Sequence, residues 1–288
     1  MLPNFFIVGA PKSGTTSLYH YLDHHPEVFM SPVKEPNYFS YEDTVQQNLY
    51  YKERGIGNLA DYEKLFESVN GQKVIGEASV SYLFYENVPS RVSEKIPNAK
   101  ILILLRNPVD RAFSHYFMDY KLRYINTSFE EVLYKKNKHV NQPLYYQQYI
   151  ELGMYFSQVK RYLDAFGQNQ VKIYIYEDLV NDVESLIKDL YTFLEIDLAY
   201  TSDLEKKYNS FEAPRNGLIR LIYSIGWLRR GIKKIVPQGG VSGIKNLFFS
   251  KTGGQKHEST IRYMKDLYKD DIIQLEKLIG RNLSTWYE

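Results

Sequence analysis

The stretch GAPKSGTTSL, residues 9–18, decides the fold expected for this chain. It follows the apolar run NFFIVGA at 4–10 and leads into a helical pattern that begins near Thr15, which is typical of a turn between a strand and a helix. Such a turn is a natural anion site, because backbone N–H groups point at the ligand and the helix dipole adds partial positive charge. The stretch nearly matches the phosphate-binding loop G-x-x-x-x-G-K-[ST], but Thr15 stands in the lysine position and a lysine lies three residues earlier, at Lys12.

Short apolar runs alternate with helical patterns along much of the chain, and this alternation predicts an α/β fold. The runs that we expect to form buried strands are rich in Val, Ile, Phe and Tyr and lie at 4–10, 27–31, 73–79, 99–107 and 170–177. Besides the helix near Thr15, helices are expected at 109–123 and at 155–166, where Gly167 closes the last one. We therefore expect a P-loop-like parallel sheet of about five strands, flanked by helices on both faces.

The C-terminal third of the chain is predicted to be helical. In STIRYMKDLYKDDIIQLEKLIG, residues 259–280, apolar side chains recur roughly at helical spacing, which is typical of a helix that packs on the core. No internal repeat or linker interrupts the sequence. Residues 1–288 are therefore expected to form a single domain.

The composition is that of an ordinary soluble globular protein, with 44% hydrophobic and 24% charged residues among 288. The 36 Lys and Arg residues against 34 Asp and Glu residues give a net charge of +2, which is too balanced to indicate a nucleic-acid partner. The chain has no cysteine, so it has neither a disulfide framework nor a thiolate metal site.

No membrane-spanning or secretory segment is expected. The apolar run ILILL at 101–105 is far shorter than the roughly 20 residues that cross a bilayer, so we expect a cytoplasmic protein. The stretch 218–236 is basic and amphipathic, and we expect it to be a core or lid helix. The alternative is an element that binds the acceptor or contacts a membrane surface, since apolar faces with Arg and Lys suit anionic or lipid-linked partners.

The phosphate loop lacks the usual machinery for a nucleoside triphosphate. Gly14 permits a tight backbone, and the hydroxyl groups of Thr15, Thr16 and Ser17 can reach phosphate oxygens. The strand at 99–107, however, leads into Arg106 and not into the acidic residue that would hold Mg²⁺. We therefore expect Lys, Arg and backbone donors to neutralise the anion, with no metal required.

A second anion site is predicted in LLRNPVDRAFSHY, residues 104–116. Arg106 stands at the carboxyl end of a strand, where open α/β sheets bind ligands, and Ser114 lies eight residues further on in the next helix. A guanidinium fork and a hydroxyl group that converge on one point suit a phosphate. Two anion sites on one sheet indicate a nucleotide that is phosphorylated at two places.

These stretches resemble the sulfotransferases that use 3′-phosphoadenosine 5′-phosphosulfate (PAPS), above all the heparan sulfate sulfotransferase domains and their bacterial counterparts. PKSGTTSL resembles their 5′-phosphosulfate loop, and RNPVDRAFSHY resembles their 3′-phosphate element. The resemblance continues through KEPNYF (34–39), GEASVSYLF (76–84), YEDLVND (176–182), FLEID (193–197) and IGRNLSTW (279–286), and thus covers nearly the whole chain. It implies an enzyme that moves a sulfuryl group from PAPS to an acceptor and releases 3′-phosphoadenosine 5′-phosphate (PAP).

The resemblance also implies residue roles. Lys12 would neutralise the charge that grows on the leaving phosphate, and Glu77 would be the base that removes the acceptor's proton. The heparan enzymes have a lysine directly after this glutamate, whereas this chain has Ala78, so Lys34, with Glu35, is expected on the acceptor side. The residues expected to bind the cofactor are Lys12, Ser13, Gly14, Thr15, Thr16, Ser17, Arg106, Ser114, Gly254 and Lys256.

The last two of these residues lie in a departure from the family pattern. The family has a Lys-Gly-Arg stretch that closes over the cofactor, and here the matching segment is KTGGQKHE, residues 251–258. Gly254 matches, but Gly253 and Gln255 replace the two cations, so we expect Lys256, together with Lys251, to compensate.

Two other functions stay open at this point. A P-loop kinase that acts on a small molecule would need an acidic metal ligand, and a non-catalytic nucleotide-binding protein would not need both Lys12 and Glu77. The acceptor is expected to be a hydroxyl group, or an amine, of a carbohydrate or other small metabolite. If Glu77 is not the base, His20 or His115 is the next candidate.

Overall fold

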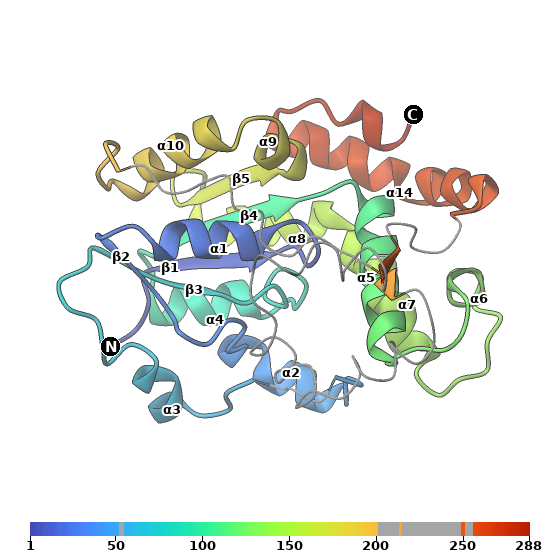
Figure 1. The fold of residues 1–288 in the computed structure, drawn as a ribbon, viewed down its shortest axis with the longest axis horizontal. Helices are drawn as coiled ribbons and strands as arrows, with labels where there is room; N and C mark the ends of the chain where they lie inside the picture. The colour runs from blue at the N-terminus through green and yellow to red at the C-terminus, as the bar shows by residue number, and fades with distance from the viewer. Residues whose placement is uncertain (52–54, 201–212, 215–248, 251–255) are drawn as a thin grey trace.

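The computed structural model describes residues 1–51, 55–200, 213–214, 249–250 and 256–288, and its centre is a five-stranded parallel sheet (Figure 1). The strands are β1 (Phe5–Gly9), β2 (Val28–Met30), β3 (Val74–Ala78), β4 (Lys100–Leu105) and β5 (Val171–Ile175). They lie in the order β2-β3-β1-β4-β5, and every neighbouring pair is parallel. The predicted α/β fold with about five parallel strands is confirmed, and each predicted strand contains one observed strand.

Helices cover both faces of the sheet because side chains alternate between the faces along each strand. On β1, Phe5 and Ile7 pack with α1 (Thr15–Asp23) and α10 (Val183–Leu194) in one core. Phe6 and Val8 belong to the other core, to which α4 (Val88–Lys95), α8 (Tyr155–Phe166) and α14 (Glu258–Ile279) contribute. Both faces of the central strands are therefore dry, which explains their continuous apolar sequences.

The predicted C-terminal helix is confirmed as α14. It buries Met264, Tyr268, Ile272 and Leu275, one residue for each turn, against the core that also contains α8. The expected end of α8 is confirmed too, because Gly167 caps it with a φ of 73° that favours glycine.

The structure also contains further helices and one further strand pair. They are η1 (Tyr38–Ser40), α2 (Tyr41–Gln46), α3 (Leu59–Lys64), α5 (Pro108–Leu122), α6 (Phe129–Leu133), α7 (Gln142–Tyr149), η2 (Glu151–Gly153), α9 (Tyr176–Asn181), η3 (Ser284–Trp286) and the short antiparallel pair β6 (Ala213–Pro214) and β7 (Phe249–Ser250). The stretch 218–236 lies outside the described residues. Within the described part of the chain, no helix is long and apolar enough to cross a membrane.

The strand order creates a crevice at the carboxyl ends of β1 and β4. The chain leaves β1 toward β2 and β3 on one side, whereas β4 and β5 lie on the other side, so the connections diverge between β1 and β4. Such a switch point is where open α/β sheets bind ligands. Helix α5 follows β4 directly and lies across this end of the sheet (Figure 1).

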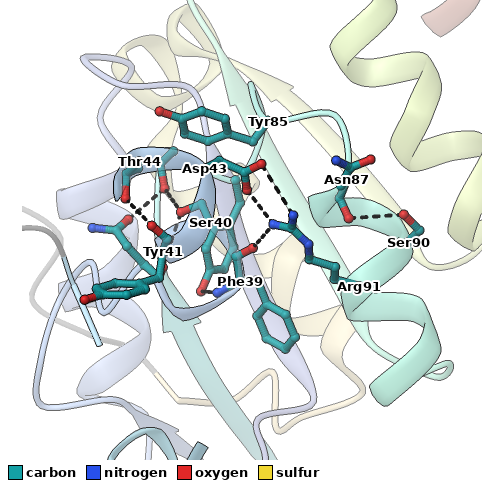
Figure 2. A network of polar contacts seen from close by, with 12 residues as sticks. Phe39, Ser40, Tyr41, Asp43, Thr44, Tyr85, Asn87, Ser90 and Arg91 are labelled. Atoms are coloured by element: carbon teal, nitrogen blue, oxygen red, sulfur yellow. Dashed lines mark hydrogen bonds and ion pairs between the residues drawn. The ribbon is translucent and has the colours of Figure 1, made fainter. Parts of the chain in front are cut away.

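A polar network fixes the segment between β2 and β3 against α4 (Figure 2). Arg91 of α4 donates a hydrogen bond to the carbonyl oxygen of Phe39 at 2.7 Å and forms an ion pair with Asp43 of α2. A second contact reaches this segment from Tyr85, which follows β3. The Tyr85 hydroxyl donates to Oε1 of Gln47 at 2.9 Å. The segment that follows β2 is thereby held to the core and forms a fixed wall next to the carboxyl end of the sheet.

Candidate active site

A cavity of about 910 Å³ lies at the carboxyl end of the sheet, at the switch point. The loops that follow β1, β2, β3 and β4 contribute to its wall, together with α5 and the start of α9. The sequence-predicted residues that line it are Lys12, Gly14, Thr15, Thr16, Lys34, Glu35, Arg106, Ser114 and Lys256. The fold therefore brings the two predicted anion sites and the predicted acceptor-side pair to one cavity.

The loop after β1 has the backbone of an anion cradle. Lys12 and Gly14 both have positive φ values, 71° and 97°, and Gly14 is the N-cap of α1 without any side-chain cap. The N–H groups at the start of α1 therefore remain available for an anionic ligand. A side chain at position 14 would also crowd α9, because a Cβ atom there would lie 2.6 Å from Cδ2 of Leu179.

The Lys12 ammonium group is largely withdrawn from water. Its Nζ donates to the thioether sulfur of Met118 on α5 at 3.3 Å, which is a weak acceptor. Burial lowers the pKa of Lys12 to about 8, although attraction to Asp119 and Glu35 opposes this shift. A charged phosphate beside this ammonium group would stabilise its protonated form.

Arg106 connects the two predicted anion sites. Its Nη1 donates to the carbonyl oxygen of Lys12 at 2.9 Å, and its guanidinium group lies over the ring of Tyr176 at 4.5 Å from the centroid. The Tyr155 hydroxyl in turn donates to the carbonyl oxygen of Arg106 at 3.0 Å. Arg106 is thus held in a fixed orientation. Ser114, in the second turn of α5, lines the same cavity.

Glu77 lies elsewhere. It is fully buried in β3, where it is paired with Phe6 and belongs to the sheet face that carries α4 and α8. It does not line the cavity, and neither carboxylate oxygen has a hydrogen-bond partner of normal geometry within the described residues. Burial raises the pKa of Glu77 to about 8, although the hydroxyl groups of Tyr82 and Tyr62 oppose this effect. The basic role of Glu77 remains a prediction, and this position gives the carboxylate no open route to an acceptor.

Glu35 is the carboxylate that does reach the cavity. It has a positive φ of 64°, and its N–H group donates to the carbonyl oxygen of Ala78 at 2.8 Å, which fixes its loop to the end of β3. Its side chain forms an ion pair with Lys34 at 2.6 Å, and its charge contributes to the electrostatic field at Lys12. Both members of the predicted acceptor-side pair therefore lie beside the predicted cofactor loop.

The other predicted residues have mixed positions. The Ser13 side chain is buried off the cavity wall, and its Oγ has no hydrogen-bond partner among the residues that the structure describes. Ser17 lies in the first turn of α1 and does not line the cavity. Lys256 lines the cavity but is paired with Asp110 of α5 at 2.7 Å. Gly254 and Lys251 lie outside the described residues.

Two groups at the site were missed by the sequence reasoning. Tyr176 begins α9 directly after β5, and only its place at the end of the strand predicted at 170–177 marked it as a neighbour of Arg106. Asp119 lies in the middle of α5, where an acidic residue normally faces solvent, yet it is fully buried below Lys12. Its partners come from segments far away in the sequence, so no local pattern indicated them.

The fallback histidines differ in position. His115 of α5 lines the cavity but is nearly fully buried, and burial and the charges of Arg111 and Lys12 hold its pKa well below the usual range. His20 lies in α1 and is not part of the cavity wall. Across the described ranges, no group of three or more His, Asp and Glu side chains is arranged to hold a metal ion.

Comparisons with known proteins agree with this geometry. The family model of the sulfotransferase domain matches residues 2–223. A sulfotransferase from Alicyclobacillus acidocaldarius, known from its crystal structure, is 32% identical, with all of both chains covered and a TM-score of 0.75. The bifunctional heparan sulfate N-deacetylase/N-sulfotransferase 1 of Mus musculus is 25% identical over 99% of this chain and 30% of that protein.

A more local match is a membrane-associated sulfotransferase of Dictyostelium discoideum, which is 40% identical over 115 residues, 40% of this chain and 22% of that protein. The chain thus spans less than a third of the length of these two curated relatives.

Proposed function

Since the chain belongs to the sulfotransferase domain family and is therefore a transferase, we propose that it moves a sulfuryl group from PAPS to a hydroxyl group, or an amine, of a small acceptor. The observation that carries this proposal is the meeting of two anion sites in one cavity. The loop after β1 offers Lys12 and the uncapped start of α1, and the end of β4 offers Arg106 with Ser114.

The residues present fit a nucleotide with phosphates at both its 5′ and 3′ positions. The start of α1 and Lys12 would hold the 5′-phosphosulfate, because aligned N–H groups and a partly dehydrated ammonium group favour an anion. Arg106 uses one nitrogen on the Lys12 carbonyl, so its other donors and the Ser114 hydroxyl would hold the 3′-phosphate. PAPS supplies the sulfuryl group.

We propose that Glu35, and not Glu77, removes the proton from the acceptor. A general base must come within hydrogen-bond reach of the proton that it accepts, and Glu35 is the one of these two glutamates whose side chain lines the cavity. The neighbouring Lys34 keeps the Glu35 carboxylate ionised and oriented through the 2.6 Å ion pair. Glu35 takes the acceptor's proton at its carboxylate oxygen as the acceptor oxygen bonds to sulfur.

Lys12 acts on the opposite side of the transfer. The bond between sulfur and the phosphate oxygen breaks, and the electron pair stays on the phosphate, where the Lys12 ammonium group neutralises it. Because Glu35 and Lys12 come from loops after different strands, they can flank the transferred group and favour an in-line geometry. Positioning and charge stabilisation by the chain's own residues then account for the chemistry.

The acceptor side of the cavity favours an acceptor with an uncharged body. Here the acceptor wall means the cavity-lining residues within 34–51, 80–85 and 117–124. Of the described residues in this wall, only Lys34 and Glu35 are charged, and they pair with each other. The rest are mostly aromatic or aliphatic, with some neutral polar groups, namely Asn37, Thr44, Leu49, Tyr51, Val80, Ser81, Phe84, Tyr85, Phe117, Met118, Leu122 and Tyr124. A neutral carbohydrate or other neutral small metabolite matches this wall better than a polyanionic chain.

The decisive experiment is an acceptor screen with PAPS that carries a labelled sulfuryl group. We expect transfer in the presence of a metal chelator, and faster transfer to neutral acceptors than to an anionic heparan-type oligosaccharide. ATP with a labelled γ-phosphate is the parallel assay for the kinase alternative. Phosphoryl transfer to the same acceptors, without sulfuryl transfer, would overturn the proposed function.

A further inference from the structure

Asp119 carries an unusual set of contacts for a helix carboxylate that is fully buried. Its Oδ2 accepts hydrogen bonds from three tyrosine hydroxyl groups, those of Tyr50 at 2.8 Å, Tyr51 at 2.7 Å and Tyr149 at 2.9 Å. Its Oδ1 is buried and has no hydrogen-bond partner within the described part of the chain. Oδ2 is thus saturated with donors, whereas Oδ1 has no donor among the described residues.

His115 of α5 joins this cluster through Tyr51. Its Nε2 lies 2.8 Å from the Tyr51 oxygen, and its Nδ1 lies 3.1 Å from the carbonyl oxygen of Gln148 and 3.3 Å from Nη1 of Arg111. The Tyr51 hydroxyl has a single proton, and donation to a carboxylate is stronger than donation to a neutral imidazole, so this proton is directed at Asp119.

The charge of Asp119 acts on the Lys12 ammonium group. His115, Met118 and Asp119 share one face of α5, because they lie three and four residues apart, and Met118 contacts Nζ of Lys12 at 3.3 Å. The other charged groups that act on Lys12 are Arg106 after β4, and Lys34 and Glu35 after β2. Lys34 and Glu35 largely cancel each other in their ion pair, so Asp119 is the negative charge that balances Arg106.

We propose that Asp119 is a positioning residue, the buried counter-charge that keeps the Lys12 ammonium group protonated and directed at the leaving phosphate. This inference rests on the proposed function only for the role of Lys12, since the coupling of the two charges does not depend on any acceptor. Burial raises the pKa of Asp119 to about 6, and the hydrogen bonds from the three tyrosines oppose this shift, so the carboxylate is ionised at neutral pH. A merely structural node would need the hydrogen bonds of Asp119 but not its charge.

Asp119→Asn separates these two roles. The asparagine oxygen can still accept from the tyrosines, whereas its amide group would occupy the place of the unpartnered Oδ1 and bring no negative charge. The readout is the pH dependence of Lys12 modification by acetic anhydride, followed by peptide mass spectrometry, which requires no activity. We expect the midpoint for Lys12 to fall by about one pH unit, the lower end of the effect of a nearby opposite charge.

Two control variants test whether the shift at Lys12 is specific to the charge of Asp119. Tyr149→Phe removes one hydrogen bond but leaves the carboxylate, so its Lys12 midpoint should stay at the wild-type value. Asp164→Asn removes a surface carboxylate of α8 that pairs with Lys160, and it should also change nothing at Lys12.

An Asp119→Asn protein that melts cooperatively and keeps the wild-type Lys12 midpoint would overturn the proposal, as would an equal shift in Tyr149→Phe. If Asp119→Asn does not fold, Asp119→Leu combined with Tyr50→Phe and Tyr149→Phe gives a second test. This variant removes the charge together with two of its donors, and the remaining Tyr51 hydroxyl keeps His115 as a partner. A lack of sulfuryl transfer in every acceptor assay would count against the proposed function, while the Lys12 midpoint would still decide the charge coupling.

Discussion

Arg106 donates a hydrogen bond from Nη1 to the carbonyl oxygen of Lys12 at 2.9 Å, across the crevice between β4 and β1. The residue predicted to bind one phosphate therefore also braces the loop predicted to bind the other. The ring of Tyr176 below the guanidinium group limits its freedom further. A substitution at Arg106 should consequently affect both anion sites, but to different extents.

Arg106→Ala is expected to weaken PAP binding by several kcal/mol at most, the scale of one truncated buried charge contact. AMP, which lacks the 3′-phosphate, should lose less affinity, because it senses only the loss of the brace on Lys12. Isothermal titration calorimetry with both nucleotides measures the difference. Arg106→Lys is the matched control, since it retains the charge but not the fork. Equal losses for PAP and AMP would contradict a role of Arg106 at the 3′-phosphate.

A pair of conservative variants distinguishes the proposed roles of Glu35 and Glu77. Glu35→Gln should lower turnover on the order of 10²- to 10⁴-fold, the usual range for the loss of a general base, while PAP affinity changes little. Glu77→Gln should retain far more activity, because its side chain does not line the cavity. Steady-state rates on any working acceptor, with PAP affinity measured separately, check both. The reverse ranking of the two variants would restore Glu77 as the base.

Activity should fall as the pH rises through about 8. The cause is Lys12, since burial lowers its pKa to about 8 and only its protonated form can neutralise a leaving phosphate. In the free enzyme this loss appears in kcat/KM. In the complex, the negative charge of bound PAPS should raise the pKa of Lys12, so kcat should fall only at a higher pH. Lys12→Ala should lower both turnover and PAP affinity and should remove this alkaline limb. A pH profile of kcat/KM that stays flat between pH 7 and 10 would be incompatible with this role.

Glu77 should make the folded state lose stability as the pH rises. Its folded pKa, about 8, lies above the usual value of 4.5, so its contribution is fully present below pH 4.5 and is lost as the pH rises to about 8. Glu77→Gln does not titrate, so its stability relative to the wild type should increase by about 1 kcal/mol per pH unit across this window. Urea unfolding at pH 5, 6, 7 and 8 measures this trend, and parallel stability curves for the two proteins would refute it.

The sequence predicted the fold well because buried parallel strands are apolar on both faces. ILILL at 101–105 has no polar position for this reason, and the observed β4 buries all five residues. The loops at the carboxyl ends of the strands were predictable for the same reason, since parallel strands bring those ends to one edge. The position of Lys12 next to Arg106 follows directly from the order in which β1 and β4 lie.

The direction of individual side chains was harder to predict. The resemblance implies a basic role for Glu77, which remains a prediction, but Glu77 lies inside β3, where alternation places it on the same face as Ile75, toward a protein layer. Glu35 lies in a loop with a left-handed backbone, which no propensity indicates for a glutamate. Asp119 depends on Tyr50 and Tyr51, which come from a distant segment, so only the folded chain brings them together.

The contact between Gly14 and Leu179 links the size of two residues that are far apart in the sequence. A Cβ at position 14 would lie 2.6 Å from Cδ2 of Leu179 and 3.3 Å from the ring of Tyr176, so even one methyl group would displace the Leu179 side chain. The Tyr176 ring, which supports Arg106, would have to shift slightly as well. The close packing of Leu179 against Gly14 thus leaves no room for a side chain at position 14. Substitutions at position 14 in related chains should therefore be accompanied by a smaller residue at position 179.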